Sequence, residues 1–117
     1  MSEDKLKEFI SNESQYHEMK ERKDILGQFA YVSRKVLDEG WKVGYMCREK
    51  AERENESGWQ FMGGNEDDAY LSDFHNIAIM SVHSLVQLDR TVWKYITAPV
   101  GTRLIRVASE EFETDKN

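Results

Sequence analysis

The strongest strand pattern in the chain is Trp41-Lys42-Val43-Gly44-Tyr45-Met46-Cys47-Arg48, and a shorter one, Trp59-Gln60-Phe61-Met62, follows it. Every second residue is apolar or aromatic, and this period of two predicts strands that bury one face. The polar stretch 49–57 predicts a long, charged connection that joins the two strands as an antiparallel hairpin. The residues expected on the buried face are Trp41, Val43, Tyr45, Cys47, Trp59 and Phe61.

On both sides of this hairpin the pattern predicts short strands and short helices in alternation. Strands are expected over 28–33, 77–80 and 102–108, and residues that favour helix N-termini precede the helices between them. The long helical crossovers of a parallel βαβ fold are absent from this pattern. We therefore expect an α+β fold with a mainly antiparallel sheet and short helices on one of its faces. The predicted N-caps are Ser33, Asn65, Ser81 and Asp89.

The two ends of the chain differ in composition from its middle. Residues 1–27 are expected to form an N-terminal helical extension, with a break or kink in the polar stretch 11–14. Residues 28–108 are expected to form the α+β domain, and the acidic residues 109–117 a flexible tail. The added helix offers one further possibility, the interface of a homodimer.

The 117 residues suit one domain, and 22 acidic residues outnumber 16 lysines and arginines, giving a net charge of -6. This charge disfavours binding to nucleic acid or to an anionic membrane, because both require a basic face. It suits a basic protein partner. Cys47 is the only cysteine, and the sequence shows neither a signal-like segment nor an apolar run of about 20 residues. We therefore expect a cytoplasmic protein.

Much of the negative charge falls between residues 49 and 68. Seven carboxylates lie there, opposed only by Lys50 and Arg53. One interpretation is a solvated loop followed by a helix whose N-terminus favours negative charge. The other is a docking surface for a cationic partner. The seven acidic residues are Glu49, Glu52, Glu54, Glu56, Glu66, Asp67 and Asp68.

Arg48 lies at the end of the first strand, just before this acidic stretch. We expect an ion pair between Arg48 and Glu66, Asp67 or Asp68, and the alternative is a bidentate contact to a carboxylate or phosphate of a ligand. In that alternative, a pocket beside Arg48, Trp59 and the segment Gly64–Tyr70 would belong to a small-molecule-binding or enzymatic domain.

The sequence contains no specific catalytic, metal or cofactor motif. Cys47 with His75 or His83 lacks the local signature of a cysteine nucleophile, and a buried cysteine is usually inert. Asp73, His75 and His83 match no zinc spacing, and Gly63-Gly64 lacks the rest of a phosphate loop. We therefore predict no catalytic residue, no metal and no cofactor. This favours a non-catalytic protein and leaves enzymatic activity open.

Three blocks of sequence follow one another in order: Val43-Gly44-Tyr45-Met46-Cys47-Arg48-Glu49, Ser57-Gly58-Trp59-Gln60-Phe61 and Gly64-Asn65-Glu66-Asp67-Asp68-Ala69-Tyr70. Together they resemble the bacterial immunity protein 33 domain family, and the resemblance runs from about Phe29 to Arg106. Three positions depart from the family pattern. Cys47 stands where the family often has an aromatic residue, Asn65 replaces an acid, and Lys50-Ala51 replaces a common proline.

The resemblance implies an α+β fold and a protein that neutralises, by direct binding, a toxin carried by the same or a neighbouring bacterial strain. It carries over no catalytic residue. The motif residues expected to be structural are Gly44, Tyr45, Gly58, Trp59, Phe61 and Gly64. The residues expected to contact the partner are Arg48, Glu49, Glu52, Glu54, Glu56, Glu66, Asp67, Asp68 and Tyr70.

Overall fold

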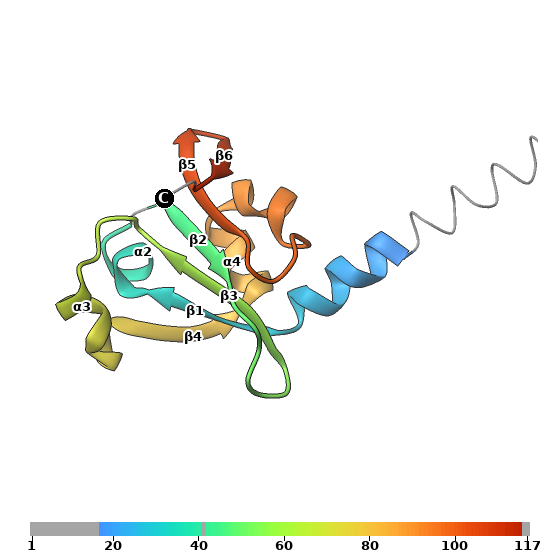
Figure 1. Cartoon of the computed structure of the whole chain (residues 1–117), viewed down its shortest axis with the longest axis horizontal. Coiled ribbons are helices and arrows are strands. Elements are labelled where there is room, and N and C mark those ends of the chain that lie inside the picture. The colour runs from blue at the N-terminus through green and yellow to red at the C-terminus, as the bar shows by residue number, and fades with distance from the viewer. Residues whose placement is uncertain (1–16, 41, 116–117) are drawn as a thin grey trace, which may run out of the picture.

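A six-stranded sheet forms the centre of the molecule, as the computed structural model of residues 17–40 and 42–115 shows (Figure 1). The strand order is β4-β1-β3-β2-β5-β6, and β1 and β3 are parallel while every other neighbouring pair is antiparallel. The predicted α+β fold with a mainly antiparallel sheet is therefore confirmed. The strands are β1 (Phe29–Ser33), β2 (Tyr45–Arg48), β3 (Glu56–Met62), β4 (Ile77–Ser81), β5 (Arg103–Ala108) and β6 (Glu111–Thr114).

Short helices connect these strands, and side-chain caps begin them. Ser33, Ser81 and Asp89 accept hydrogen bonds from the first-turn amides of the helices that follow them, as predicted. Asn65 is not a cap: Asp67 begins the next helix instead, and its Oδ1 accepts a hydrogen bond from the amide of Tyr70 at 2.8 Å. The helices are α2 (Arg34–Asp38), α3 (Asp68–Ser72), α4 (Val82–Leu88) and the 3-10 helices η1 (Phe74–Asn76) and η2 (Arg90–Tyr95).

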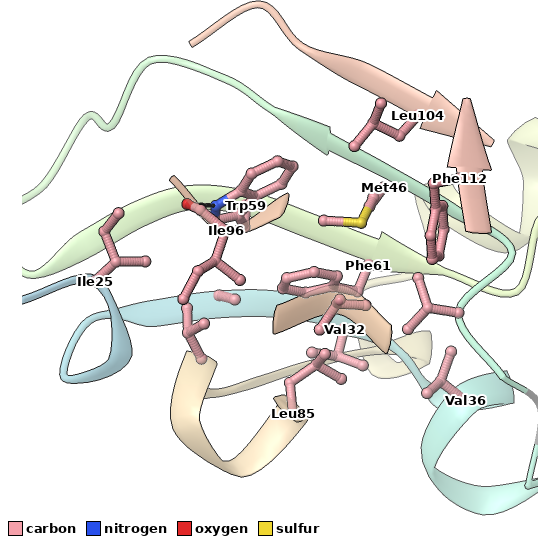
Figure 2. Packing of buried hydrophobic residues seen from close by; sticks show 14 residues of the cluster. Ile25, Val32, Val36, Met46, Trp59, Phe61, Leu85, Ile96, Leu104 and Phe112 are labelled. Atoms are coloured by element: carbon pink, nitrogen blue, oxygen red, sulfur yellow. Dashed lines mark hydrogen bonds between the residues drawn. The ribbon is translucent and has the colours of Figure 1, made fainter. Parts of the chain in front are cut away.

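One face of the sheet, here called the covered face, packs against α4 and η2 (Figures 1 and 2). Strand register places Val32, Phe61, Met46 and Leu104 in one row across the sheet, and all four are buried. Trp59 is completely buried beside them, and its indole N–H donates to the carbonyl of Ile96 in the turn after η2 at 2.9 Å. The prediction that Trp59 and Phe61 share a buried face is confirmed.

The predicted faces of the first hairpin strand are partly wrong. Val43 and Met46 lie in the core, whereas Cys47 is directly opposite Gln60 on the other face of the sheet. The alternation changes phase near Gly44, where the chain crosses Gly63 so closely that a Cβ on Gly44 would lie 2.1 Å from the Gly63 carbonyl oxygen. Strand β2 begins only after this crossing, and Trp41 lies outside the described residues.

The acidic segment predicted to be a flexible tail instead forms β6, which pairs with β5. Phe112 is its buried residue and packs edge-to-face on Tyr95, with ring centroids 5.4 Å apart. The amide of Phe112 also donates to the Tyr95 hydroxyl at 3.1 Å. Pairing with β5 and the burial of Phe112 against Tyr95 of η2 together hold this acidic segment on the domain.

The N-terminal helix is described over residues 17–26, and the expected break at 11–14 lies outside the described residues. Ile25 is buried in the main core. Arg22 donates to the Trp93 carbonyl at 2.6 Å, and its guanidinium lies 5.2 Å from the centroid of the Trp93 ring. The last turns of this helix therefore pack as part of the domain. No helix among the described residues is long and apolar enough to cross a membrane.

A buried ion pair joins the covered face to the outer strands. Asp89 is almost fully buried and pairs with Arg106, whose Nε also donates to the Val43 carbonyl at 2.7 Å. The second contact of the Asp89 carboxylate oxygen is the Val43 amide, at 3.1 Å. The pair thus fixes the stretch before β2 against η2 and β5 through these three polar contacts.

Candidate partner-binding site

The acidic residues that are close in sequence form two separate groups in space. Strand β3 runs between them, with the β2–β3 connection at its start and the α3 segment beyond its end (Figure 1). Seven strand residues span about 20 Å at roughly 3.3 Å per residue. The seven carboxylates therefore do not make one continuous patch.

The first group lies in the acidic loop, residues 49–55, and in Glu56, which begins β3. Glu49 lies 3.8 Å from Arg103, and both side chains are about half exposed. Glu52 and Glu54 are exposed, and within the described part of the chain no cation pairs with either carboxylate. As far as residues 17–40 and 42–115 show, these two negative charges are available to an external partner.

Glu56 is held by the sheet itself. Its Oε1 accepts a hydrogen bond from the Tyr31 hydroxyl at 2.7 Å, and its Oε2 accepts one from the Glu52 amide at 3.2 Å. The bond from Tyr31 lowers the pKa of Glu56 and raises that of Tyr31, because it favours the charged carboxylate and the neutral phenol. Glu56 thus stays ionised and fixed in direction.

The second group, at the far end of β3, is used mainly to build its own loop. Glu66 accepts hydrogen bonds from the amides of Gly63 and Gly64, both at 2.8 Å. Burial opposes its ionisation, but the bonds from Ser33 and from these amides lower its pKa overall. With Asp67 committed to capping α3, two of the three carboxylates here have internal structural partners.

Asp68 and Tyr70 complete this second group and are both on α3. Asp68 is exposed in the first turn of the helix. The Lys35 ammonium lies 5.0 Å from the Tyr70 ring centroid and donates to Asn65 Oδ1 at 3.2 Å. Tyr70 is therefore already partnered by a cation of this chain.

Arg48 does not form the ion pair that we expected with Glu66, Asp67 or Asp68. Its Nε donates to the Ser57 carbonyl at 2.9 Å and its Nη1 to the Ala98 carbonyl at 2.8 Å. Its guanidinium lies 5.8 Å from the centroid of the Trp59 ring. Burial lowers the pKa of Arg48, and the carboxylate of Glu21 partly offsets this effect. Arg48 thus braces β2 and β3 against the turn that precedes β5.

The alternative pocket beside Arg48, Trp59 and the segment Gly64–Tyr70 is not formed. Trp59 is completely buried with its indole N–H satisfied, and Arg48 lies opposite it in the hairpin register. The segment Gly64–Tyr70 follows the other end of β3. These residues therefore share no cavity.

The residues of the family motif lie in the β2–β3 hairpin, in the loop after it and in the hydrophobic core. Besides the Gly44 crossing, Gly58 has a φ of 85°, and a Cβ there would lie 2.0 Å from the Glu49 carbonyl oxygen. Gly64 gives its amide to Glu66, and Tyr45 is half-buried, with its pKa raised by that burial. Trp59 and Phe61 are in the core. The motif thus encodes the hairpin crossings and the hydrophobic centre.

The opposite face of the sheet, here called the open face, carries residues that the sequence analysis did not select. Register places Ile79, Tyr31, Gln60 and Cys47 in a row across β4, β1, β3 and β2. Ile79 is 64% exposed, and Phe29, two residues from Tyr31, is 47% exposed. The strand 29–33 is apolar at both alternate sets of positions, so its pattern gives no contrast between a buried and an exposed face.

Three cavities meet at Tyr31 on this open face. One of about 240 Å3 lies between Phe29, Ile79 and Glu54, and one of about 410 Å3 extends along Glu52 to Gln60. The third, of about 250 Å3, reaches Leu71 of α3. A hollow of this kind suits a side chain or segment of a partner.

Two other expectations concern reactive groups. Cys47 is buried, and burial raises the pKa of its thiol, which disfavours the nucleophilic thiolate. Its Sγ lies 3.7 Å from Gln60 Oε1. Within residues 17–40 and 42–115, no group of three or more His, Cys, Asp or Glu side chains could hold a metal ion.

These features define a class: a small α+β protein with a tightly packed covered face, and an open face bordered by exposed carboxylates. The family described as "Immunity protein Imm33 domain" matches residues 30–116, most of the chain and all six strands except the first residue of β1. The chain belongs to this family of immunity protein domains. No curated protein and no solved structure matches it.

Proposed function

We propose that this protein is a non-catalytic immunity protein that neutralises a bacterial toxin by binding it directly. The observation that carries the proposal is the family match over residues 30–116. The exposed carboxylates of Glu52 and Glu54, which pair with no cation of the described residues, support a basic partner, because opposite charges steer and speed association.

We further propose that it acts in the bacterial cytoplasm. Cys47, the only cysteine of the chain, is a free and buried thiol, which suits a reducing compartment. In that compartment the protein would meet the toxin of its own cell or one delivered by a neighbour.

The test is capture of a binding partner from the source cells with the tagged chain, followed by co-expression of that partner, if it is toxic, with this protein. Growth should be restored by the wild-type chain, and the two purified proteins should form a stable complex on size-exclusion chromatography. If the toxin remains lethal although the protein is folded and in excess, neutralisation by direct binding is wrong.

A charge-reversal series tests the electrostatic part. Glu52→Lys combined with Glu54→Lys should slow association and flatten its dependence on salt, since these carboxylates support no internal contact. Glu110→Lys combined with Glu113→Lys is the matched control, because both residues are also exposed and acidic, two charges are again reversed, and both lie in the β5–β6 hairpin outside the acidic loop. Equal association rates in all variants would contradict a role for the loop charges.

A further inference from the structure

We propose that the toxin docks on the open face through a cationic segment that lies across Tyr31, between β4 and the acidic loop. This inference rests on the proposed function and adds the surface and the chemistry of the partner. The Tyr31 groove consists of the two cavities that share Tyr31 and Glu56, with Phe29 and Ile79 at one end and Glu52 at the other.

The floor of the groove is apolar and rigid. Phe29 and Ile79 project from neighbouring strands β1 and β4, and both are large side chains left substantially exposed. Exposed apolar side chains that gather beside a hollow mark interaction sites more often than single ones do. Because they stand on paired strands, a partner would bind them without ordering a flexible loop.

The wall of the groove is negatively charged. Glu56 lines both cavities and is held by Tyr31. Glu54 and Arg53 also line the first cavity, and Glu49, Glu52 and Lys50 the second, so the carboxylates outnumber the cations in each. Four carboxylates of the stretch 49–56 face only Lys50 and Arg53 as local cations. The combination of an aromatic ring, an apolar floor and fixed carboxylates matches an arginine or lysine side chain, whose stem is apolar and whose end is cationic.

The same charge argues against other occupants. A second copy of this chain would bring its own acidic loop against this one, and like charges facing each other weaken association. An anionic lipid surface would be repelled for the same reason. The groove therefore fits a basic segment of a different protein.

The first experiment maps a defined probe on the whole 15N-labelled chain by NMR. The probe is the acetylated and amidated peptide Arg-Leu-Arg-Leu-Arg, and the matched control peptide has glutamate in place of arginine. We expect saturable shifts concentrated at the amides of 29–31, 54–56 and 79, which added salt removes. Shifts centred on 66–70 or on 110–115, or no shifts at all, would overturn the proposal.

A pair of variants separates groove binding from general attraction to an acidic protein. Glu54→Lys should weaken the peptide at least about fivefold, as expected when one exposed ion pair becomes a repulsion, and Glu110→Lys, in the turn between β5 and β6, should change it less than about twofold. Both substitutions are at exposed positions, so both variants should fold. Equal weakening by the two would mean that only net charge matters.

The toxin itself gives a separate readout. Ile79→Ser with Glu54→Lys should reduce toxin affinity at least about tenfold, whereas Leu88→Ser with Glu110→Lys, at the end of α4 and in the turn between β5 and β6, should not. Normal neutralisation by the groove variant would refute the docking site and leave the proposed function intact. Failure of the wild-type chain to neutralise the toxin would instead refute the proposed function. The NMR titration with the peptide would still test whether the groove binds a cationic segment.

Discussion

The two faces of the sheet use apolar side chains in opposite ways. On the covered face, Trp59 and Phe61 are completely buried and Trp59 has its polar atom satisfied. On the open face, Phe29 and Ile79 also come from strands of the sheet but are 47% and 64% exposed. The difference separates stability from recognition: substitutions on the covered face should unfold the protein, and substitutions on the open face should change what it binds.

The largest expected effect is the loss of Trp59. Trp59→Ala removes a completely buried ring and the hydrogen bond to Ile96, and we expect it to cost about 4 kcal/mol of unfolding free energy. Urea denaturation followed by circular dichroism measures this. A cost similar to that of an exposed residue would contradict the central place of Trp59 in the core.

The next largest effect concerns the buried ion pair. Asp89→Asn leaves Arg106 without its carboxylate partner in a mostly buried site, which we expect to cost about 3 kcal/mol. Adding Arg106→Met should recover part of this loss, because the second change removes the unpaired charge. Thermal unfolding of the single and double variants tests this, and strictly additive losses would show that the two residues are not coupled.

A smaller effect on stability, and a sharp contrast with Trp59, is expected on the open face. Ile79→Ser removes a side chain that is already 64% exposed, so it should change the free energy of unfolding by less than about 0.5 kcal/mol. Denaturation beside the Trp59→Ala variant makes the comparison direct. A loss of several kcal/mol would mean that this face is in contact with another part of the protein.

The smallest effect is a change of titration. Tyr31→Phe removes the hydrogen bond to Glu56, so the pKa of Glu56 should rise toward its ordinary value. Because the folded-state pKa of Glu56 is lowered, its bond with Tyr31 stabilises the fold above the ordinary glutamate pKa. That contribution disappears as the pH falls through the lowered value. The two proteins should therefore converge in stability in acid, and NMR titration of the Glu56 carboxyl carbon measures the shift; an unchanged pKa would contradict this role of Tyr31.

Local signals predicted local structure well. Ser33, Ser81 and Asp89 cap helices because a short polar side chain needs only its own next turn to do so. The α+β class and the hairpin followed from strand periodicity. The prediction of Asn65 as an N-cap was wrong. Asn65 and Asp67 are both residue types that cap helices and lie two positions apart, and the hydrogen bonds from the backbone to Glu66 decide between them.

Contacts between distant segments could not be predicted in the same way. The change of face between Val43 and Met46 depends on Gly44 crossing Gly63, and strand alternation carries no information about that approach. Arg48 donates hydrogen bonds to the carbonyls of Ser57 and Ala98 and does not pair with the acidic residues. The Ala98 carbonyl, in the turn before β5, is remote in sequence and could not be foreseen from the local pattern. For the candidate site, the sequence selected the acidic loop but not Tyr31, Phe29 or Ile79.

The parallel pairing of β1 with β3 has a consequence for how the chain acquires its fold. The hairpins β2–β3 and β5–β6 join neighbouring segments and close small loops, which is a fast step. Strand β1, in contrast, has β4 and β3 as its neighbours, so it has no strand partner until β3 is available and only one until β4 follows. During synthesis from the N-terminus, β1 is made first, but both of its edges can pair only after residues 56–81 have followed. Until then its apolar side chains are exposed to aggregation.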